Sequence, residues 1–108
     1  MANNFVSRGE VLTLTAANTR TSGLPYREYG FNGVALIDAA QNESYTLQIR
    51  GIFEFGVLSP VATVSPGDLI YITSGNVLTK ISTNNTLYGR AVTGTDADGN
   101  FHCLLLQA

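Results

Sequence analysis

The chain has 108 residues, of which 44% are hydrophobic and 13% are charged, and its formal net charge is −2. This length fits one domain with one modest core. A charged fraction well below the roughly 25% of an average soluble domain suits β-structure, and it equally suits a surface that other subunits partly cover. Because the one lysine and the five arginines are scattered, the sequence disfavours nucleic acid as a partner.

The apolar runs, the N-terminal segment and the cysteine content indicate the cellular compartment that suits the protein. No apolar run approaches the roughly 18 residues of a membrane span, and the first residues lack the charged and apolar segments of a secretory signal. Cys103 is the only cysteine, so no intrachain disulfide can form. We therefore expect no membrane partner, and a chain that is compatible with a reducing cytoplasm.

Short strands are predicted in the first third of the chain. Residues 1–8 are polar, and we expect them to form an extended arm. The alternation in residues 11–16 (Val-Leu-Thr-Leu-Thr-Ala) predicts a strand. A long polar loop is expected at 18–25, a short edge strand at 29–31, and a strand buried on both faces at 33–37.

Residues 45–57 form the longest regular stretch. Apolar residues occupy one parity and polar residues the other, which predicts a strand with one apolar face. At about 3.3 Å per residue the stretch would span roughly 40 Å, whereas ~100 residues give a radius of gyration near 13 Å. The strand should therefore bend, and Gly51 is the predicted corner. Ile52 interrupts the polar face, so either the register shifts there or Ile52 faces a partner.

The second half of the chain predicts strands joined by tight turns. Pro66 and Gly67 suit a type II turn before a strand at 69–73, and Gly75 and Asn76 suit a hairpin turn into 77–79. The last two strands are predicted at 87–92 and 101–106, and no helix of ten residues is expected. The prediction is an all-β single domain over residues 1–108, either a small compact β-barrel or a jelly-roll-like sandwich.

The residues that could carry chemistry do not form a recognisable site. His102 and Cys103 are neighbours on a predicted strand, so their side chains point to opposite faces and cannot act together. With one histidine and one cysteine, a zinc site would need at least two carboxylates. Residues 96–100 (Asp-Ala-Asp-Gly-Asn) begin like a calcium loop, but their glycine falls at the fourth position rather than the sixth, which favours a polar hairpin turn. We expect no catalytic residue, no cofactor and no metal, and a binding or structural role.

Several segments together resemble a known family, the small phage capsid-decoration or cement proteins. They are residues 6–16 (Val-Ser-Arg-Gly-Glu-Val-Leu-Thr-Leu-Thr-Ala), 33–39 (Gly-Val-Ala-Leu-Ile-Asp-Ala), 46–54 (Thr-Leu-Gln-Ile-Arg-Gly-Ile-Phe-Glu), 67–71 (Gly-Asp-Leu-Ile-Tyr), 87–91 (Leu-Tyr-Gly-Arg-Ala) and the apolar C-terminal strand. These segments follow the family's order and cover most of the chain. The chain departs from the pattern in the loop between residues 20 and 29.

The resemblance implies a structural virion protein without catalytic activity. Such proteins bind the major capsid protein on the outer surface of a phage head and cement neighbouring capsomers. We expect a homotrimer, with a dimer as the alternative, which resides on the virion and is found in the host cytoplasm during assembly. A symmetric oligomer suits this role because several modest contacts then act together.

Contacts with the capsid or between subunits are expected in three places. The N-terminal arm could add a strand to a capsid subunit. The other two places are the loop between residues 20 and 29, and the residue that interrupts the polar face of the central stretch, Ile52. The expected contact residues are Asn3, Asn4, Phe5, Arg20, Tyr26 and Ile52. The alternative function is a small carbohydrate- or peptide-binding β-module that uses Tyr26, Tyr29 and Phe31 as an exposed aromatic patch.

Overall fold

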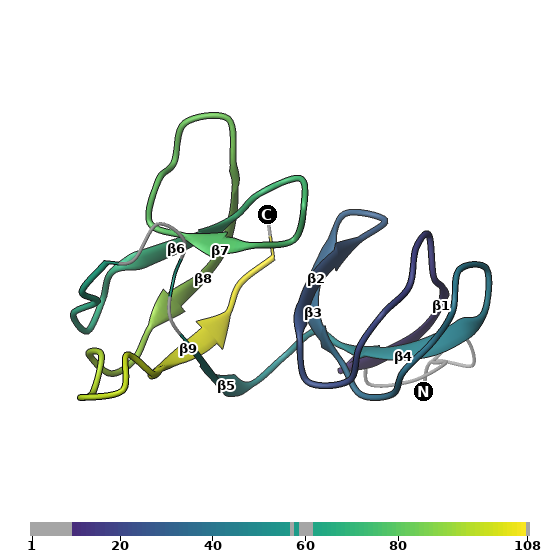
Figure 1. Ribbon diagram of the computed structural model, residues 1–108, viewed down its shortest axis with the longest axis horizontal. Helices are drawn as coiled ribbons and strands as arrows, with labels where there is room; N and C mark the ends of the chain where they lie inside the picture. Colours follow the sequence, from purple (N-terminus) through teal and green to yellow (C-terminus); the bar gives the residue numbers. More distant parts are fainter. Residues whose placement is uncertain (1–9, 57, 59–61, 108) are drawn as a thin grey trace, which may run out of the picture.

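The computed structural model describes residues 10–56, 58 and 62–107. Across these residues the chain forms two antiparallel sheets, one of which is a half-barrel (Figure 1). The four-stranded sheet has the order β1-β4-β3-β2, and the five-stranded sheet has the order β5-β9-β8-β6-β7. The strands are β1 (Val11–Thr15), β2 (Pro25–Glu28), β3 (Phe31–Ala35), β4 (Ser44–Gln48), β5 (Ile52–Phe55), β6 (Leu69–Ile72), β7 (Leu78–Thr79), β8 (Thr86–Ala91) and β9 (Phe101–Leu105).

The all-β prediction is confirmed, and most predicted strands exist. The expected strands at 11–16, 69–73, 87–92 and 101–106 correspond to β1, β6, β8 and β9. Each begins and ends within about a residue of the predicted bounds, because alternating apolar residues and flanking turns define these segments well. The extended arm expected at residues 1–8 lies outside the described residues.

The long central stretch is divided between the two sheets. Its first part is β4 of the four-stranded sheet, and its second part is β5 of the five-stranded sheet. Gly51 lies between them with φ +127°, a backbone conformation that side-chain-bearing residues rarely adopt. The predicted corner at Gly51 is therefore confirmed, and its consequence is a crossover between sheets. Figure 1 shows the chain passing from β4 of one sheet to β5 of the other.

Each sheet buries its own apolar cluster. Tyr45 and Leu47 of β4 pack in the cluster of the four-stranded sheet, while Phe55 of β5 packs in the larger cluster of the five-stranded sheet. Strand β3 contributes to both, because Val34 packs in the larger cluster and its neighbour Ala35 in the smaller one. Successive side chains of a strand point to opposite faces, so β3 forms a wall between the two clusters.

Buried polar groups join the two sheets. Asn32 of β3 has no exposed surface, and its Nδ2 donates 2.8 Å hydrogen bonds to the carbonyl oxygens of Leu87 and Leu106. Its backbone N–H donates to Oε1 of Gln107, whose Nε2 donates in turn to the Asn32 carbonyl oxygen. The hydroxyl of Tyr88 donates to the carbonyl oxygen of Gly33 at 2.6 Å. These directional contacts fix how the β2–β3 hairpin sits on the five-stranded sheet.

The prediction for residues 29–37 is wrong in two respects. Residues 29 and 30 are the turn between β2 and β3, with φ 51° at Tyr29 and 85° at Gly30, and they are not an edge strand. Two-residue hairpin loops favour such positive φ angles, and Gly30 supplies one without strain. In addition, β3 ends at Ala35, and Leu36 and Ile37 are exposed rather than buried.

Two predicted turns are confirmed. Asp68 donates its N–H to the Ser65 carbonyl oxygen at 3.0 Å and Gly67 has φ 91°, as a type II turn requires. Between β8 and β9, the Asp96 carboxylate accepts the N–H groups of Asp98 and Asn100 at 2.9 and 3.0 Å. The second turn is therefore the expected polar hairpin, in which Asp96 binds its own backbone.

Candidate interaction surfaces

A buried ion pair lies under the loop between β1 and β2. Arg20 and Glu28 are 5% and 4% exposed, and Arg20 donates to Glu28 through Nε at 3.1 Å and through Nη2 at 3.2 Å. The Tyr45 hydroxyl donates to the same carboxylate at 2.9 Å, and the Arg20 guanidinium lies 4.6 Å from the centre of the Tyr26 ring. Buried charges are tolerated when they are paired and fully hydrogen-bonded, as Glu28 is here.

This cluster gives the β1–β2 loop a fixed shape. The backbone of Arg20 forms an antiparallel bridge with Ala39, with N–O distances of 2.8 and 3.0 Å. Thr21 donates its N–H to the Tyr26 hydroxyl at 2.8 Å, and Ser22 donates its N–H to Oδ1 of Asp38 at 2.7 Å. The loop that the sequence predicted as long and polar is therefore anchored at three successive residues.

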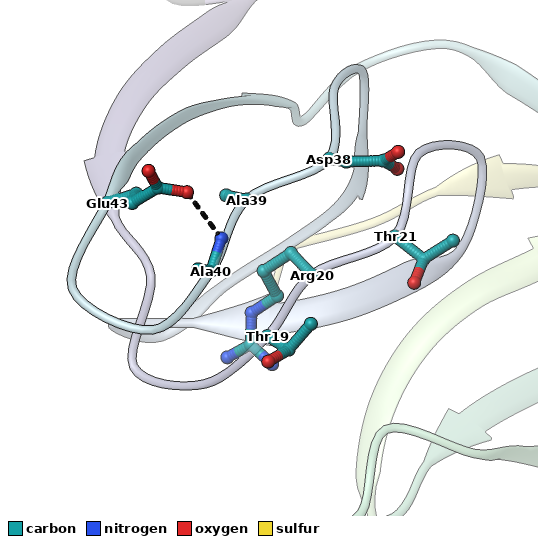
Figure 2. Close-up of a pocket in the computed structure, with 7 residues that line it drawn as sticks. All are labelled: Thr19, Arg20, Thr21, Asp38, Ala39, Ala40 and Glu43. Atoms are coloured by element: carbon teal, nitrogen blue, oxygen red, sulfur yellow. Dashed lines mark hydrogen bonds between the residues drawn. The ribbon is translucent and has the colours of Figure 1, made fainter.

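A shallow hollow of about 370 Å³ lies beside this loop (Figure 2). Its two carboxylates belong to Asp38 and Glu43, and each accepts a backbone N–H, from Ser22 and Ala40 respectively. Both acids are thus used to shape the loops, and the hollow offers no opposed acid and base for catalysis. Its lining residues are Thr19, Arg20, Thr21, Asp38, Ala39, Ala40 and Glu43.

The residues with reactive side chains are held apart or buried. His102 is exposed and Cys103 is fully buried, as expected for neighbours on a strand. Burial raises the pKa of the Cys103 thiol to about 12, which leaves it protonated and unreactive near neutral pH. Within residues 10–56, 58 and 62–107, no three His, Cys, Asp or Glu side chains cluster closely enough to hold a metal ion. The described part of the chain also contains no helix that could cross a membrane.

The outer face of the five-stranded sheet carries an exposed apolar pair. Ile52 of β5 lies directly opposite Leu104 of β9, and these side chains are 57% and 39% exposed. Arg90 of β8 continues the same row, and Glu54 faces His102 in the next row. The sequence pattern singled out Ile52 but not Leu104 or Arg90. The alternation within residues 101–105, with Phe101, Cys103 and Leu105 inside, was the signal that could have found Leu104.

The structure distributes the expected contact residues unevenly. Asn3, Asn4 and Phe5 lie outside the described residues. Arg20 of the β1–β2 loop and Tyr26 of β2 are buried, whereas Ile52 is exposed. Their roles in capsid or subunit contacts stay predictions.

The exposed aromatic patch expected for a binding module is not formed. Tyr26 is only 8% exposed, and its ring lies against the Arg20 guanidinium. Tyr29 is exposed in the β2–β3 turn, and Phe31 is exposed at the start of β3. The prediction of a three-ring patch is therefore wrong, because alternation along β2 directs Tyr26 inward.

Comparison with known protein families decides the identity. Residues 6–106 match the family described as phage cement protein. The chain belongs to the phage cement protein family. The expectation drawn from the resemblance is thereby confirmed: this is a non-catalytic structural protein that binds and stabilises a phage capsid and resides on the virion. No curated protein and no solved structure matches this cement protein.

Proposed function

We propose that this cement protein acts as a homotrimer on the outer surface of a phage head, where it ties neighbouring capsomers together. Membership of the family supports binding to the capsid. The exposed Ile52–Leu104 pair on a sheet face carries the proposal of an oligomer, because contiguous apolar surface on a small domain marks an interaction site. A symmetric oligomer engages several capsid subunits at once, so modest contacts combine into stable attachment.

Two segments are proposed to contact the capsid. The arm that includes Asn3, Asn4 and Phe5 adds a strand to a capsid subunit through main-chain hydrogen bonds. The anchored loop above Arg20 and Tyr26 presents its exposed residues to the head. In this assignment Arg20 and Tyr26 hold the shape of the loop from beneath. The low fraction of charged residues in the chain reduces the free-energy cost of removing water from the contact surface.

Co-sedimentation with expanded, undecorated heads of the parent phage tests the proposal. We expect the protein to pellet with the heads and to saturate at a fixed ratio to the capsid subunits. Deletion of residues 2–7 should abolish pelleting while light scattering still reports the wild-type oligomer. A control that replaces residues 2–7 by a Gly-Ser segment of equal length separates the loss of sequence from the loss of length. Absence of pelleting by the wild-type protein would contradict the proposed function.

A further inference from the structure

The outer face of the five-stranded sheet combines an apolar centre with opposite charges at its two sides. Ile52, Leu104 and Arg90 lie in one row across β5, β9 and β8, and directly paired residues place their Cβ atoms roughly 5 Å apart. Glu54 lies one row along β5, opposite His102. The acid, Glu54, therefore lies on β5, and the base, Arg90, lies on β8. Ile52 lies on the same strand as Glu54, and Leu104 lies on β9, between β5 and β8.

Ile52 and Leu104 differ from the other exposed apolar residues because they are paired with each other in the sheet. Leu36 and Ile37 follow the end of β3, and Val77 and Ile81 flank β7, so none of these lies within a strand. Among the exposed large hydrophobic residues of the described chain, only Ile52 and Leu104 face each other in strand register. A two-residue apolar ladder on a pleated face suits packing against another flat surface.

Arg90 is available for a second partner. Arg90 is exposed, and its Nη1 donates a 3.0 Å hydrogen bond to the Gly67 carbonyl oxygen. A guanidinium carries five N–H donors in a fixed fork, so this bond orients the group and leaves donors for a carboxylate. Glu54 is likewise exposed on the edge strand β5.

We propose that a second copy of this chain docks on this face, with Ile52 and Leu104 at the centre and Glu54 of one copy paired with Arg90 of the next. The acid and the base lie at opposite sides of the apolar centre, so in a cyclic trimer the acidic side of each copy meets the basic side of the next. This inference rests on the proposed homo-oligomer and names its surface. The capsid contacts remain with the arm and the anchored loop.

A charge exchange tests the pairing. We expect Glu54→Arg and Arg90→Glu each to raise the dissociation constant of the oligomer about tenfold or more, measured by sedimentation velocity. The double variant E54R/R90E should restore the constant to within about threefold of the wild-type value, because the same pair forms with its charges exchanged. Single variants that match the wild type, or a double variant as weak as the singles, would overturn the assignment.

A second pair of variants tests the apolar centre. Ile52→Asp should dissociate the oligomer, while Ile37→Asp, which changes an exposed isoleucine just beyond β3 of the four-stranded sheet, should leave it intact. Circular dichroism checks that both variants are folded, and Leu104→Ser replaces Ile52→Asp if the latter unfolds. Equal association of wild type, Ile52→Asp and Ile37→Asp would contradict the proposal.

These measurements contain no phage heads, which separates this inference from the proposed function. If the wild-type protein is monomeric at every concentration, the interface proposal fails, and pelleting with heads is still measurable. If the oligomer forms through this face but does not pellet with heads, the proposed function fails and the interface stands.

Discussion

At the residue scale, the most consequential side chain is Glu28. Its carboxylate is 4% exposed and accepts hydrogen bonds from Arg20, from the Tyr45 hydroxyl and from the backbone N–H of Ala17. One acid thus connects the β1–β2 loop, strand β2 and strand β4. The pairing of Glu28 with Arg20, eight residues earlier, was not predictable from the sequence, because it depends on the tertiary fold.

Replacing Glu28 by Gln should lower the free energy of unfolding by about 3 kcal/mol. Glutamine keeps the size of the side chain but leaves the Arg20 guanidinium buried without its counter-charge, and its amide group adds donors where acceptors are needed. Urea denaturation followed by circular dichroism measures the change. Glu10→Gln, at an exposed position, is the matched control and should change stability by less than about 0.5 kcal/mol. Equal stability of the two variants would show that the ion pair contributes little.

Three buried acids, Tyr45, Tyr88 and Cys103, should make the protein less stable in alkali, because burial raises the pKa of each. Burial raises the pKa of Cys103 to about 12, and burial together with the Glu28 carboxylate raises the pKa of Tyr45 to about 12, from ordinary values of 9.0 and 10.0. Between pH 9 and 12 the folded state therefore binds more protons than the unfolded state. This contribution to stability is fully present below pH 9 and is lost as the pH rises towards 12.

The alkaline dependence can be assigned to Tyr45 by substitution. Tyr45→Phe should reduce the fall in unfolding free energy between pH 10 and 12, because the group that titrates in the unfolded chain is removed. Tyr29→Phe removes a 65% exposed hydroxyl and should leave the slope unchanged. Denaturant midpoints measured in this pH range decide the matter, and parallel curves for all three proteins would refute the assignment.

At the scale of elements, the crossover at Gly51 decides the architecture. Residues 45–57 present a single apolar parity, yet β4 and β5 serve different clusters. The alternation of apolar and polar residues indicates which face of a strand is apolar. It does not indicate which sheet the strand joins. For this reason the strands and the corner were predictable from the sequence, whereas the division into two sheets was not.

Gly51→Ala should lower the free energy of unfolding by about 1–3 kcal/mol. A Cβ atom there would have its nearest neighbours at 3.4 and 3.5 Å, so the cost arises from forcing an L-residue to φ +127° rather than from a clash. Gly75→Ala is the control, because Gly75 has no such φ and the nearest atom to its added Cβ lies 3.8 Å away. Urea denaturation compares the two, and an unchanged Gly51→Ala would mean that the crossover tolerates other backbone conformations.

The expected contact residues illustrate the same limit of sequence-based prediction. Ile52 breaks the alternation of its own strand and is exposed in the structure, as a partner-facing residue would be. Arg20 and Tyr26 look like exposed polar and aromatic loop residues in the sequence. Both are buried in the structure, where a cation–π contact and an ion pair join the β1–β2 loop to strand β2.

At the scale of the whole molecule, a buried polar network crosses the junction between the sheets. Asn32 accepts a hydrogen bond from Arg27 Nη1 and donates to the carbonyl oxygens of Leu87 and Leu106, while Gln107 closes the network from the C-terminal side. A polar junction specifies one relative orientation of the sheets, because each buried group needs its own partner. A fixed orientation suits the proposed division of the surface into segments that bind the capsid and a face that docks neighbouring copies.

Asn32→Ala should therefore destabilise the protein by at least about 2 kcal/mol. The carbonyl oxygens of Leu87 and Leu106 would lose their buried donor, and hydrogen exchange should accelerate in β3 and β9 together. Asn85→Ala removes a solvent-exposed hydrogen bond to the Ile81 carbonyl oxygen and should cost less than about 1 kcal/mol. Protection that persists in both strands of Asn32→Ala would indicate that apolar packing alone holds the sheets together.

The thermal stability of phage heads tests the central claim most directly. Expanded heads that lack this protein are mixed with wild-type protein, and capsid melting is followed by scanning calorimetry. Because a ligand that binds only the assembled state stabilises it by mass action, decorated heads should melt at a higher temperature than bare heads, and the shift should grow with protein concentration until the sites are filled. Heads that bind the protein and melt at the unchanged temperature would contradict its role as a cement.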